Sequence, residues 1–502
     1  MLAPYRLITS SLLIQEGALF SRGDVEVKTF TRRPLLHPTT LSHLPIYFIH
    51  SLERFDGRPT RIVDTVDRQE YFIVIDELEV KHCKKLMDCI AVIIREIFVS
   101  YRYTKQHQSY DELFTETIST LFYGVGNLKD STRHFIAIMA ATRHRCSFLV
   151  DLHEREFERY GGDPKWLRGL KYVDDPKLQF LDNINVILAH QPWLCNGEYI
   201  TGLVHGDAQS HWSVHDLAQA VVILTHTHAL CSFVHGVGAV NPSQSPESHR
   251  SECSDWAQRN KENTGSQTGE VEELLRRMAT LRRPTIDGGE MSANNALHFL
   301  ALADGSSDVH SGGESPVGNS GDEEAVFSYQ KEFGYVDFAA RKDTAKTFKI
   351  HEFTWDHAYN LLNDLIPESA QNLDEKFDLT QKLTYSFMGG YENVDTTVYR
   401  SAVWNYIHAL FGIRHDDYDY AKVNTLLSRE MKTFIKTAAC FPHRITDDMR
   451  ASVMKDFKMS EKIHVMLLIM EARLQASLLY FTRALTNHYS QAKRATQPKR
   501  LD

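Results

Sequence analysis

The sequence predicts an all-α protein with two helical domains joined by a long disordered linker that contains one helix. Through residues 111–240 and 324–490, apolar residues recur at helical spacing, and no alternating strand pattern interrupts them. Residues 241–323 are instead rich in Ser, Gly, Pro and acidic residues, with too little apolar surface to offset the entropy of ordering. These differences in composition define the predicted domain organisation.

Composition restricts the classes of function. At 502 residues, of which 42% are hydrophobic, the chain is long enough for two or three domains with their own cores. The net charge of −9 argues against nucleic acid as the main partner. The sequence contains no run of about 18 apolar residues, so it predicts no membrane-spanning helix. The seven scattered cysteines suggest no disulfide pattern, so we expect free thiols in a reducing compartment, with the cytoplasm as the default.

The two ends of the chain give the weakest patterns. In the N-terminal segment 1–110, residues 70–75 fit a strand, and residues 89–103 fit a helix or a strand equally well. The N-terminus lacks a basic start followed by an unbroken apolar run, so no signal peptide is expected. We treat 1–110 as a divergent segment without assigned function and residues 491–502 as a disordered tail.

Periodicity and capping residues place the helices of both domains. In the N-terminal domain they cover residues 113–123, 131–160, 164–170, 176–189, 197–204 and 213–235. In the C-terminal domain they cover residues 355–365, 374–385, 394–411, 421–438, 445–457 and 461–487. Ser213, followed by Asp216 three residues later, is a capping box that opens the helix 213–235. In the linker, residues 271–283 form the short amphipathic helix.

The helix 131–160 has a thiol and an imidazole on one apolar stripe. The stripe consists of Phe135, Ile138, Met139, Thr142, Cys146, Leu149 and His153. Arg143 and Arg145 would favour the thiolate of Cys146, which makes it a candidate low-pKa cysteine. Seven residues of a straight helix span about 10.5 Å, so Cys146 and His153 would need a relay group between them. On the residues alone, a buried and inert cysteine is the preferred interpretation.

Three histidines and a cysteine also gather on the helix 213–235: His226, His228, Cys231 and His235. Metal ligands must converge, but 226 and 228 point to different faces of a helix. No second ligand group with suitable spacing exists elsewhere. We therefore expect no metal and no other cofactor.

Five long motifs occur in the same order as in the sestrins and closely resemble them. They are RHFIAIMAATRHRCSFLVDLH at 133–153, GGDPKWL at 161–167, LAHQPWL at 188–194, HWSVHDL at 211–217 and WNYIHALFGIRHDDYDY at 404–420. The resemblance covers roughly 111–240 and 325–490. It implies two alkylhydroperoxidase D-like helical domains related by pseudo-twofold symmetry, in a stress-responsive, amino-acid-sensing regulator of TOR signalling.

The resemblance gives Cys146 and His153 a candidate catalytic role. In sestrins a cysteine, a tyrosine two residues later and a histidine seven residues later have been proposed to reduce alkyl hydroperoxides. Phe148 replaces the tyrosine here, which removes the hydroxyl best placed to relay a proton. Leu149 stands where a second thiol would complete a Cys-x-x-Cys pair, so turnover would need an external reductant. A weak alkyl hydroperoxide reductase is therefore an alternative function.

The resemblance also implies an amino-acid pocket in the C-terminal domain. A free amino acid needs an acid for its ammonium group, a donor for its carboxylate and an apolar pocket for its side chain. The polar positions that bind leucine in leucine-sensing sestrins match Thr384, Thr396, Arg400 and Glu461. Without the resemblance, Glu461 would merely offset a helix dipole and Arg400 would be a surface cation.

The apolar part of that pocket is altered. Phe457 and His464 match the family, whereas Tyr399 replaces a leucine, Met454 a tryptophan and Phe387 a third lid threonine. Tyr399 adds bulk, while Met454 removes it and is adaptable. Leucine or a related amino acid is the implied ligand, and its identity is left open.

A third implied site binds a protein partner. Asp416 and Asp417, in the run HDDYDY, and Ser213 match sestrin residues needed to engage the GATOR-two complex. By itself the acidic run fits a solvated turn better than an interface.

The predicted function is that of an intracellular stress and amino-acid sensor. It would bind the GATOR-two complex, lower TOR complex 1 signalling, and be released when an amino acid binds. The Rag GTPases and AMP-activated kinase are further partner candidates, and nuclear and lysosome-surface pools are further candidate locations. A thiol peroxidase and a ligand-independent scaffold are the rival functions.

Overall fold

The computed structural model describes residues 107–205, 210–239, 269–281, 326–337, 340–341 and 348–496, together with short strands nearer the N-terminus. β1 (Phe20–Ser21) pairs antiparallel with β2 (Glu26–Val27), and β3 (Ile62–Thr65) pairs antiparallel with β4 (Glu70–Ile73). β4 lies where the sequence predicts a strand. The predictions for residues 89–103, for most of the linker and for the end of the tail lie outside the described residues.

From Gln108 onward the described chain is mainly helical, which confirms the predicted all-α class. The N-terminal half contains α5 (Gln108–Tyr123), α6 (Asp130–Arg143), α7 (Ser147–Arg159), α8 (Pro176–His190), α9 (Gly197–Val204) and α10 (Val214–Val237). Its 3-10 turns are η3 (Trp166–Arg168), η4 (Leu170–Tyr172) and η5 (Pro192–Leu194). The linker helix is α12 (Glu270–Leu281).

The C-terminal half repeats this helical character with a few short strands. Its helices are α14 (Trp355–Leu365), α15 (Pro367–Thr380), α16 (Thr397–Leu410), α17 (Ala421–Leu426), α18 (Arg429–Cys440), α19 (Asp447–Ser452) and α20 (Met459–Thr496), with 3-10 turns η9 (Ile350–Glu352) and η10 (Pro442–Arg444). β5 (Phe348–Lys349) pairs parallel with β8 (Ile413–Arg414), and β6 (Phe387–Met388) pairs antiparallel with β7 (Tyr391–Glu392).

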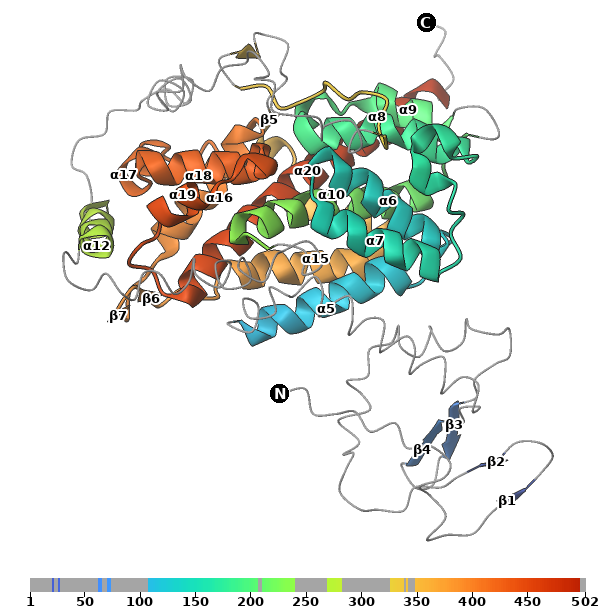
Figure 1. Cartoon of the computed structure of the whole chain (residues 1–502), viewed down its shortest axis with the longest axis horizontal. Helices are drawn as coiled ribbons and strands as arrows, with labels where there is room; N and C mark the ends of the chain where they lie inside the picture. Colours follow the sequence, from blue (N-terminus) through green and yellow to red (C-terminus); the bar gives the residue numbers. More distant parts are fainter. Residues whose placement is uncertain are drawn as a thin grey trace, which may run out of the picture. The chain divides into compact units, whose positions relative to one another are not determined.

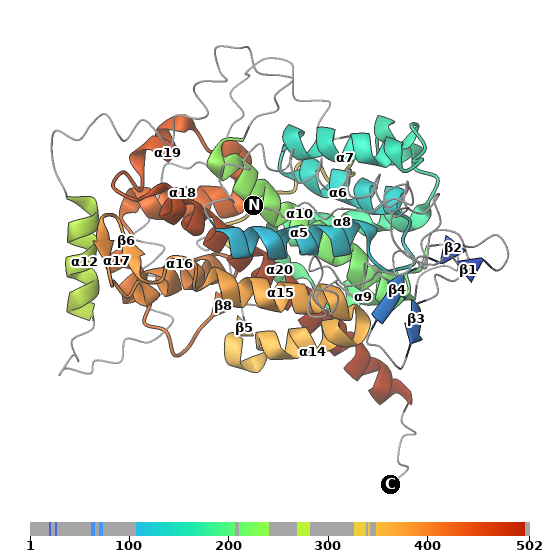
Figure 2. The same cartoon turned by 90° about the horizontal axis from the view of Figure 1, so that it is seen from below.

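The two helical halves share one core. Glu96–Phe122 and Gly126–Asp502 form one compact unit, in which α10 and α20 pack against each other at the centre (Figures 1 and 2). Every residue of α10 from Leu217 to Val234 is buried. The predicted boundary between two helical domains therefore does not divide the fold. Met1–Arg95 and Tyr123–Val125 form the other unit.

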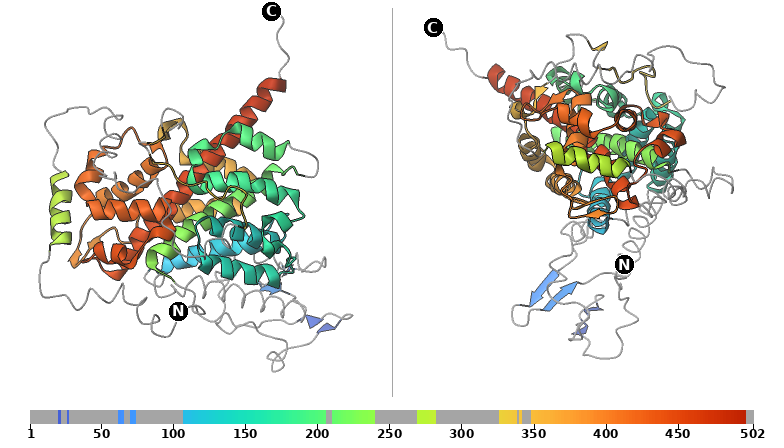
Figure 3. Two further views of the ribbon diagram at one scale, coloured as in Figure 1. Left: turned by 45° about the horizontal axis from the view of Figure 1, so that its top comes forward. Right: turned by 90° about the vertical axis from the view of Figure 1, so that its left-hand side faces the viewer.

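By length and composition alone, α10 and α20 would be long and apolar enough to span a membrane. The most apolar 18-residue windows of Val214–Val237 and Met459–Ser490 are, however, 100% and 94% buried within the fold. Such burial is typical of the core helices of a globular protein. Only the last turns of α20 project beyond the neighbouring helices (Figure 3).

The order of elements in the two halves supports the predicted internal repeat. In the first half, α8 is followed by η5, the short helix α9 and the long helix α10; in the second, α18 is followed by η10, the short helix α19 and the long helix α20. Pro192 and Pro442 open the two 3-10 turns. Asn196 and Thr446 cap the two short helices through their side chains, which satisfies backbone amides at the helix start.

Buried charges anchor α20 to the rest of the core. Lys376 of α15 and Glu471 of α20 form an ion pair of 2.9 Å between side chains that are both 0% exposed. The hydroxyl of Tyr110 from α5 donates to the same carboxylate. Two residues further along α20, the guanidinium of Arg473 donates to Ser232 Oγ at 2.5 Å and contacts His144 Nε2 at 2.7 Å. These contacts join α20 to both halves.

The prediction of one helix over 131–160 is wrong, because the chain breaks between α6 and α7. Arg145 adopts a left-handed φ of +50°, and the amide of Cys146 folds back onto Ala141 O at 3.1 Å. Left-handed backbone at a residue with a side chain is strained. The packing of α6 against α7, which the break allows, offsets that strain. The predicted stripe from Phe135 to His153 is nonetheless buried.

Other helix boundaries also shift. The predicted helix 421–438 divides into α17 and α18, because Ser428 caps α18 by accepting from Met431 N at 3.1 Å. α15 begins at Pro367, a residue suited to the first turn of a helix, well before the predicted start at 374. The helix 445–457 shortens to α19, and 164–170 is 3-10 rather than α-helical. α20 continues to Thr496, into the predicted tail.

Candidate functional site

The C-terminal half contains a small cavity between α16, the β6–β7 hairpin and the first turns of α20. Its lining consists of Thr384, Phe387, Met388, Thr396, Tyr399, Arg400, Phe457, Glu461, His464, Val465 and Leu468. The cavity thus brings together every predicted ligand-binding residue except Met454. Its water-accessible space is only about 10 Å³, roughly enough for one water molecule.

Glu461 supplies a buried carboxylate from the first turn of α20. Its side chain lines the cavity and the residue is 4% exposed, so it is not a surface charge that merely offsets the helix dipole. Its Oε2 atom accepts from the backbone amides of Gly389 at 2.8 Å and Lys458 at 2.9 Å, whereas its Oε1 atom is buried without a hydrogen-bond partner. Burial raises the pKa of Glu461, and the two amides partly oppose that shift.

Arg400 supplies a buried cation from the first turn of α16. It is 7% exposed, so the surface interpretation does not hold for this residue either. Its guanidinium donates to the hydroxyl of Thr396, the residue just before α16, and to Thr397 Oγ1 at 3.1 Å. The Nε atom of Arg400 is buried without a partner. Burial lowers the pKa of the guanidinium.

A histidine and a threonine set the hydrogen-bond polarity beside these charges. His464 Nε2 lies 2.5 Å from Thr380 O and can only donate to it, so the ring is protonated at Nε2. Burial lowers the pKa of His464 to about 3, so the ring is neutral and its Nδ1 accepts. Thr384 Oγ1, 2.6 Å from Nδ1, must therefore donate to the histidine. Its lone pairs remain available to a donor.

Aromatic side chains fill the apolar end of the cavity. Tyr399 is 5% exposed and packs edge-on against Phe457, with ring centroids 5.9 Å apart. Phe387 lines the cavity from the hairpin but is 43% exposed. Met454 is buried, has a left-handed φ of +54° and does not line the cavity as it stands, so its place in a ligand pocket stays a prediction. That backbone conformation cannot be read from the sequence.

The linker helix α12 packs against α17 and lies beside the β6–β7 hairpin (Figure 2). Glu270 Oε2 accepts from Lys455 N at 3.0 Å, and Glu270 N donates to Asp456 Oδ2 at 3.2 Å. A Cβ added to Gly389 would lie 3.0 Å from Val271 Cγ1, so α12 packs tightly on the residue whose amide holds Glu461. The linker helix is therefore docked on the two segments that surround the cavity.

The second predicted site lies in the N-terminal half, at the break between α6 and α7. Cys146 is the N-cap residue of α7 and is 1% exposed. Burial opposes its thiolate, but hydrogen bonds with Cys231 and His235 outweigh burial and lower the pKa of Cys146 to about 5. Burial and the charge of Cys146 raise the pKa of Cys231 well above its ordinary value.

His153 is not the partner of Cys146. Its Nδ1 atom lies 3.0 Å from Nδ1 of His134, and its ring stacks on Phe122 at 4.9 Å between centroids. Burial lowers the pKa of His153 to about 3. The predicted Cys146–His153 pair is therefore replaced by Cys146 and His235.

Arg143, one of the two arginines expected to favour the thiolate, has its hydrogen bonds elsewhere. Arg143 donates to backbone carbonyls beyond the linker, Gln330 O at 2.9 Å and Phe333 O at 2.5 Å. Cys231 and His235 instead supply the interactions that stabilise the thiolate. The one sequence signal for them is their spacing of four residues on a helix, which puts both on one face.

The other two histidines of α10 lie apart from the thiol. His228 Nε2 lies 2.8 Å from Asn185 Oδ1, and His226 packs against Phe114 with ring centroids 5.6 Å apart. Within the described part of the chain, no group of three or more His, Cys, Asp and Glu residues is arranged to hold a metal ion.

Comparison with known proteins identifies the family. A model of the family described as PA26 p53-induced protein (sestrin) matches residues 89–489. Sestrin-2 of Bos taurus is 41% identical over 401 residues, which cover 76% of this chain and 83% of the relative. Sestrin-1 and Sestrin-3 of Mus musculus are 40% and 41% identical over 404 and 415 residues, covering 76% of this chain and 81% and 83% of the relatives.

The chain belongs to the sestrin family. The family match begins at residue 89 and ends at residue 489, within α20. The family assignment rests on both halves of the helical unit, which contain the two sites described above.

The predicted partner residues of this sestrin lie at the surface. Ser213 caps α10 by accepting from Asp216 N at 3.0 Å, as the capping box predicts. Asp416 and Asp417 are exposed. Asp416 Oδ2 lies 3.4 Å from Lys349 Nζ and 2.9 Å from His351 Nδ1. All three residues are accessible to a partner.

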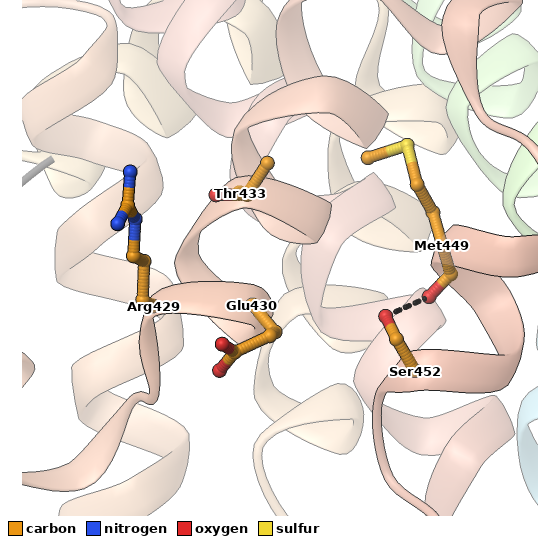
Figure 4. A pocket seen from close by; sticks show the side chains of 5 residues that line it. All are labelled: Arg429, Glu430, Thr433, Met449 and Ser452. Atoms are coloured by element: carbon orange, nitrogen blue, oxygen red, sulfur yellow. Dashed lines mark hydrogen bonds between the residues drawn. The ribbon is translucent and has the colours of Figure 1, made fainter. Parts of the chain in front are cut away.

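This sestrin also has an open hollow of about 300 Å³ between α18 and α19. It is lined by Arg429, Glu430, Thr433, Met449 and Ser452 (Figure 4). Ser452 Oγ donates to Met449 O at 2.8 Å, a contact within one helix. None of the predicted site residues lines this hollow. Glu430→Gln can therefore serve as a control that removes a carboxylate outside the predicted sites.

Proposed function

We propose that this sestrin is an intracellular amino-acid sensor. It binds the GATOR-two complex when amino acids are scarce, thereby lowers TOR complex 1 signalling, and is released when an amino acid enters the cavity beside Arg400 and Glu461. The observation that supports this proposal is the presence of two oppositely charged buried side chains, each with one unpaired polar atom, Arg400 Nε and Glu461 Oε1. Buried polar atoms normally have partners, and these two belong to oppositely charged side chains that line the same cavity, which favours a ligand there.

The chemistry of an amino acid matches the cavity group by group. Its ammonium would donate to Glu461 Oε1 and to the free lone pairs of Thr384 Oγ1. Its carboxylate would bind Arg400 Nε near the N-terminus of α16, where the helix dipole favours an anion. An apolar side chain would extend toward Tyr399 and Phe457. Leucine and its near relatives satisfy all three requirements.

Ligand entry requires the cavity to open, because about 10 Å³ cannot hold an amino acid. The β6–β7 hairpin and α12 are the elements that close it, through the Gly389–Glu461 hydrogen bond and the contact of Val271 with Gly389. A ligand that competes for Glu461 would shift the population between closed and open arrangements of these elements. Such a shift is the proposed signal for release of the partner.

Release of the GATOR-two complex tests the function. Purified chain would be bound to immobilised GATOR-two complex and challenged with leucine, isoleucine, methionine or arginine. We expect an amino acid to release the wild type and Glu430→Gln, but not Glu461→Gln, whose amide oxygen still accepts from both backbone amides. Partner binding that no amino acid changes would favour the scaffold function instead.

A second candidate function, reduction of hydroperoxides at Cys146, is favoured by the lowered pKa of that thiol. Loss of peroxide reduction in Cys146→Ser, with an unchanged response to amino acids, would establish it as a separate activity.

A further inference from the structure

We propose that Cys146 and Cys231 form a dithiol that hydroperoxides oxidise to a disulfide, with Cys146 as the attacking thiolate, Cys231 as the resolving thiol and His235 as the residue that positions and ion-pairs the thiolate. This inference rests on the second candidate function and adds two residues to it. It also replaces the expectation, based on Leu149, that Cys146 has no resolving thiol.

The position of Cys146 favours a thiolate. It is the N-cap residue of α7; its side chain makes no capping hydrogen bond, and the amide of Leu149 donates to the carbonyl of Cys146 at 3.1 Å. The positive end of a helix dipole stabilises a thiolate at such a position. Although Cys146 is buried, its neighbours Arg145 and Ser147 are both exposed, so a small opening at the helix break would give a peroxide access.

α10 presents the other two groups to the same sulfur. Cys231 and His235 are four residues apart and lie on one face of the helix, and both hydrogen-bond with Cys146. His235 Nε2 lies 3.0 Å from His144 O, a carbonyl to which it can only donate. That bond orients the ring and leaves Nδ1 for the thiolate. The carbonyl belongs to the helix break itself, so the break aligns all three groups.

The two thiols differ in protonation. Burial of His235 opposes its charge, but its hydrogen bond and attraction to Cys146 raise its pKa, which favours the protonated ring beside the Cys146 thiolate. Cys231 keeps its proton because its pKa is raised by burial and by that thiolate. An attacking thiolate beside a protonated second thiol is the arrangement that disulfide-forming pairs need.

The reaction balances with one hydroperoxide. The Cys146 thiolate attacks the outer peroxide oxygen; an S–O bond forms, the O–O bond breaks, and the alkoxide leaves as the alcohol with the proton of His235. The Cys231 sulfur then attacks the sulfenic acid; an S–S bond forms, and water leaves with the proton of Cys231. One hydroperoxide is reduced by two electrons as two thiols become a disulfide. A dithiol reductant of the thioredoxin class would restore both thiols.

Two other buried cysteines serve as internal controls. Burial raises the pKa of Cys195 and of Cys440 to about 12, so both remain thiols at neutral pH. The proposal predicts that an oxidant distinguishes Cys146 and Cys231 from these two, although all four are buried.

Peptide mapping after oxidation tests the proposal. Folded full-length protein would be treated at pH 7 with one equivalent of cumene hydroperoxide, or of hydrogen peroxide as a smaller probe, then digested without reduction. We expect a Cys146–Cys231 disulfide, while Cys195 and Cys440 stay alkylatable. In Cys231→Ser and Cys231→Ala, we expect a dimedone-trapped sulfenic acid at Cys146 that proceeds to sulfinic acid. Thioredoxin should return the wild type, but not sulfinic Cys146, to free thiols.

The outcomes separate this proposal from the function on which it rests. Sulfinic acid at Cys146 of the wild type, without the disulfide, would overturn the role of Cys231 and leave peroxide reduction at Cys146 standing. An unreactive Cys146 in the folded wild type would overturn both. Cys195→Ser is the matched control and should oxidise as the wild type does; far-ultraviolet circular dichroism of the Cys231 variants verifies that they fold.

Discussion

The two buried sites of this sestrin differ in whether their charged groups have partners. At the thiol site, the Cys146 thiolate has a counter-charge in His235 and a donor in Cys231. In the cavity of the C-terminal half, Arg400 and Glu461 each retain an unpaired buried polar atom. Both sites contact the central helix pair, since α10 provides the groups around the thiol and α20 provides Glu461.

This difference indicates what each site is built to receive. A site that satisfies its own charges needs only a small reagent that reacts with it. A site with unpaired charges of both signs needs a ligand that brings complementary charges, and pays a desolvation cost until that ligand arrives. The comparison therefore favours chemistry at Cys146 and binding at Arg400 and Glu461.

The largest expected effect comes from breaking the buried ion pair that anchors α20, a helix of the central pair that both sites contact. Lys376→Met leaves Glu471 as a buried, uncompensated carboxylate at the middle of α20. Breaking a buried pair in this way costs about 3–5 kcal/mol of unfolding free energy. The measurement is the urea midpoint of wild type and variant. Lys382→Met, which removes an exposed pair with Asp378, should change the free energy by less than about 1 kcal/mol. Equal effects of the two variants would contradict the role given to α20.

A smaller effect concerns the thiol site alone and is measured by the pH dependence of the alkylation rate of Cys146. Because the pKa of Cys146 is about 5, its alkylation rate should stay level from pH 8 to about 6 and decrease below that. In His235→Asn the Cys146 thiolate loses a stabilising side chain, and an increase of one unit in the pKa of Cys146 would slow its alkylation about tenfold below about pH 5. Iodoacetamide labelling, followed by peptide mapping, gives the rates. A Cys146 rate that falls tenfold per pH unit below pH 8 in the wild type would contradict a stabilised thiolate.

Cys146 and Glu461 predict opposite effects of pH on folding stability. The lowered pKa of Cys146 stabilises the fold fully above its ordinary value, and that contribution is lost as the pH falls through about 5. The raised pKa of Glu461 works in the other direction: the folded state binds its proton more readily, so acidification through the ordinary glutamate range favours the fold. Binding of an amino-acid ammonium should weaken over that same range.

The smallest expected effect concerns the apolar end of the cavity. Tyr399→Leu removes the ring that packs on Phe457 and makes room for a ligand side chain. Affinity for leucine should increase by about four- to fifteenfold, on the scale of one or two buried methylene groups. Competition binding with radiolabelled leucine gives the ratio, and Tyr199→Leu, on exposed α9, is the control. Weaker binding in Tyr399→Leu would place the ligand side chain elsewhere.

Local signals in the sequence predicted the elements well. The capping box at Ser213 and the helix α14 lie where the pattern places them. Helical spacing also predicted which side of the stripe around Phe135 is buried. These features depend on neighbours within a few turns of the same helix, so they are readable from one sequence.

Features that depend on distant contacts could not be predicted from the pattern. The helix break at Arg145 has no Gly or Pro to mark it, because the packing of α6 on α7 determines it. The sequence alone does not relate His235 of α10 to Cys146, because only the fold brings these two residues together. The resemblance to sestrins supplied Arg400 and Glu461, but not their unpaired atoms or the left-handed backbone of Met454.

The most direct test of the central claim is calorimetric titration of the purified chain with leucine, isoleucine, methionine and arginine. We predict saturable binding of leucine or a near relative, at one site. In Glu461→Gln, loss of a buried charged partner should cost about 2 kcal/mol or more, which is at least about a 30-fold loss of affinity. Glu430→Gln should bind as the wild type does. Absence of heat with every amino acid, or equal affinity in Glu461→Gln, would contradict the claim that this cavity is an amino-acid sensor.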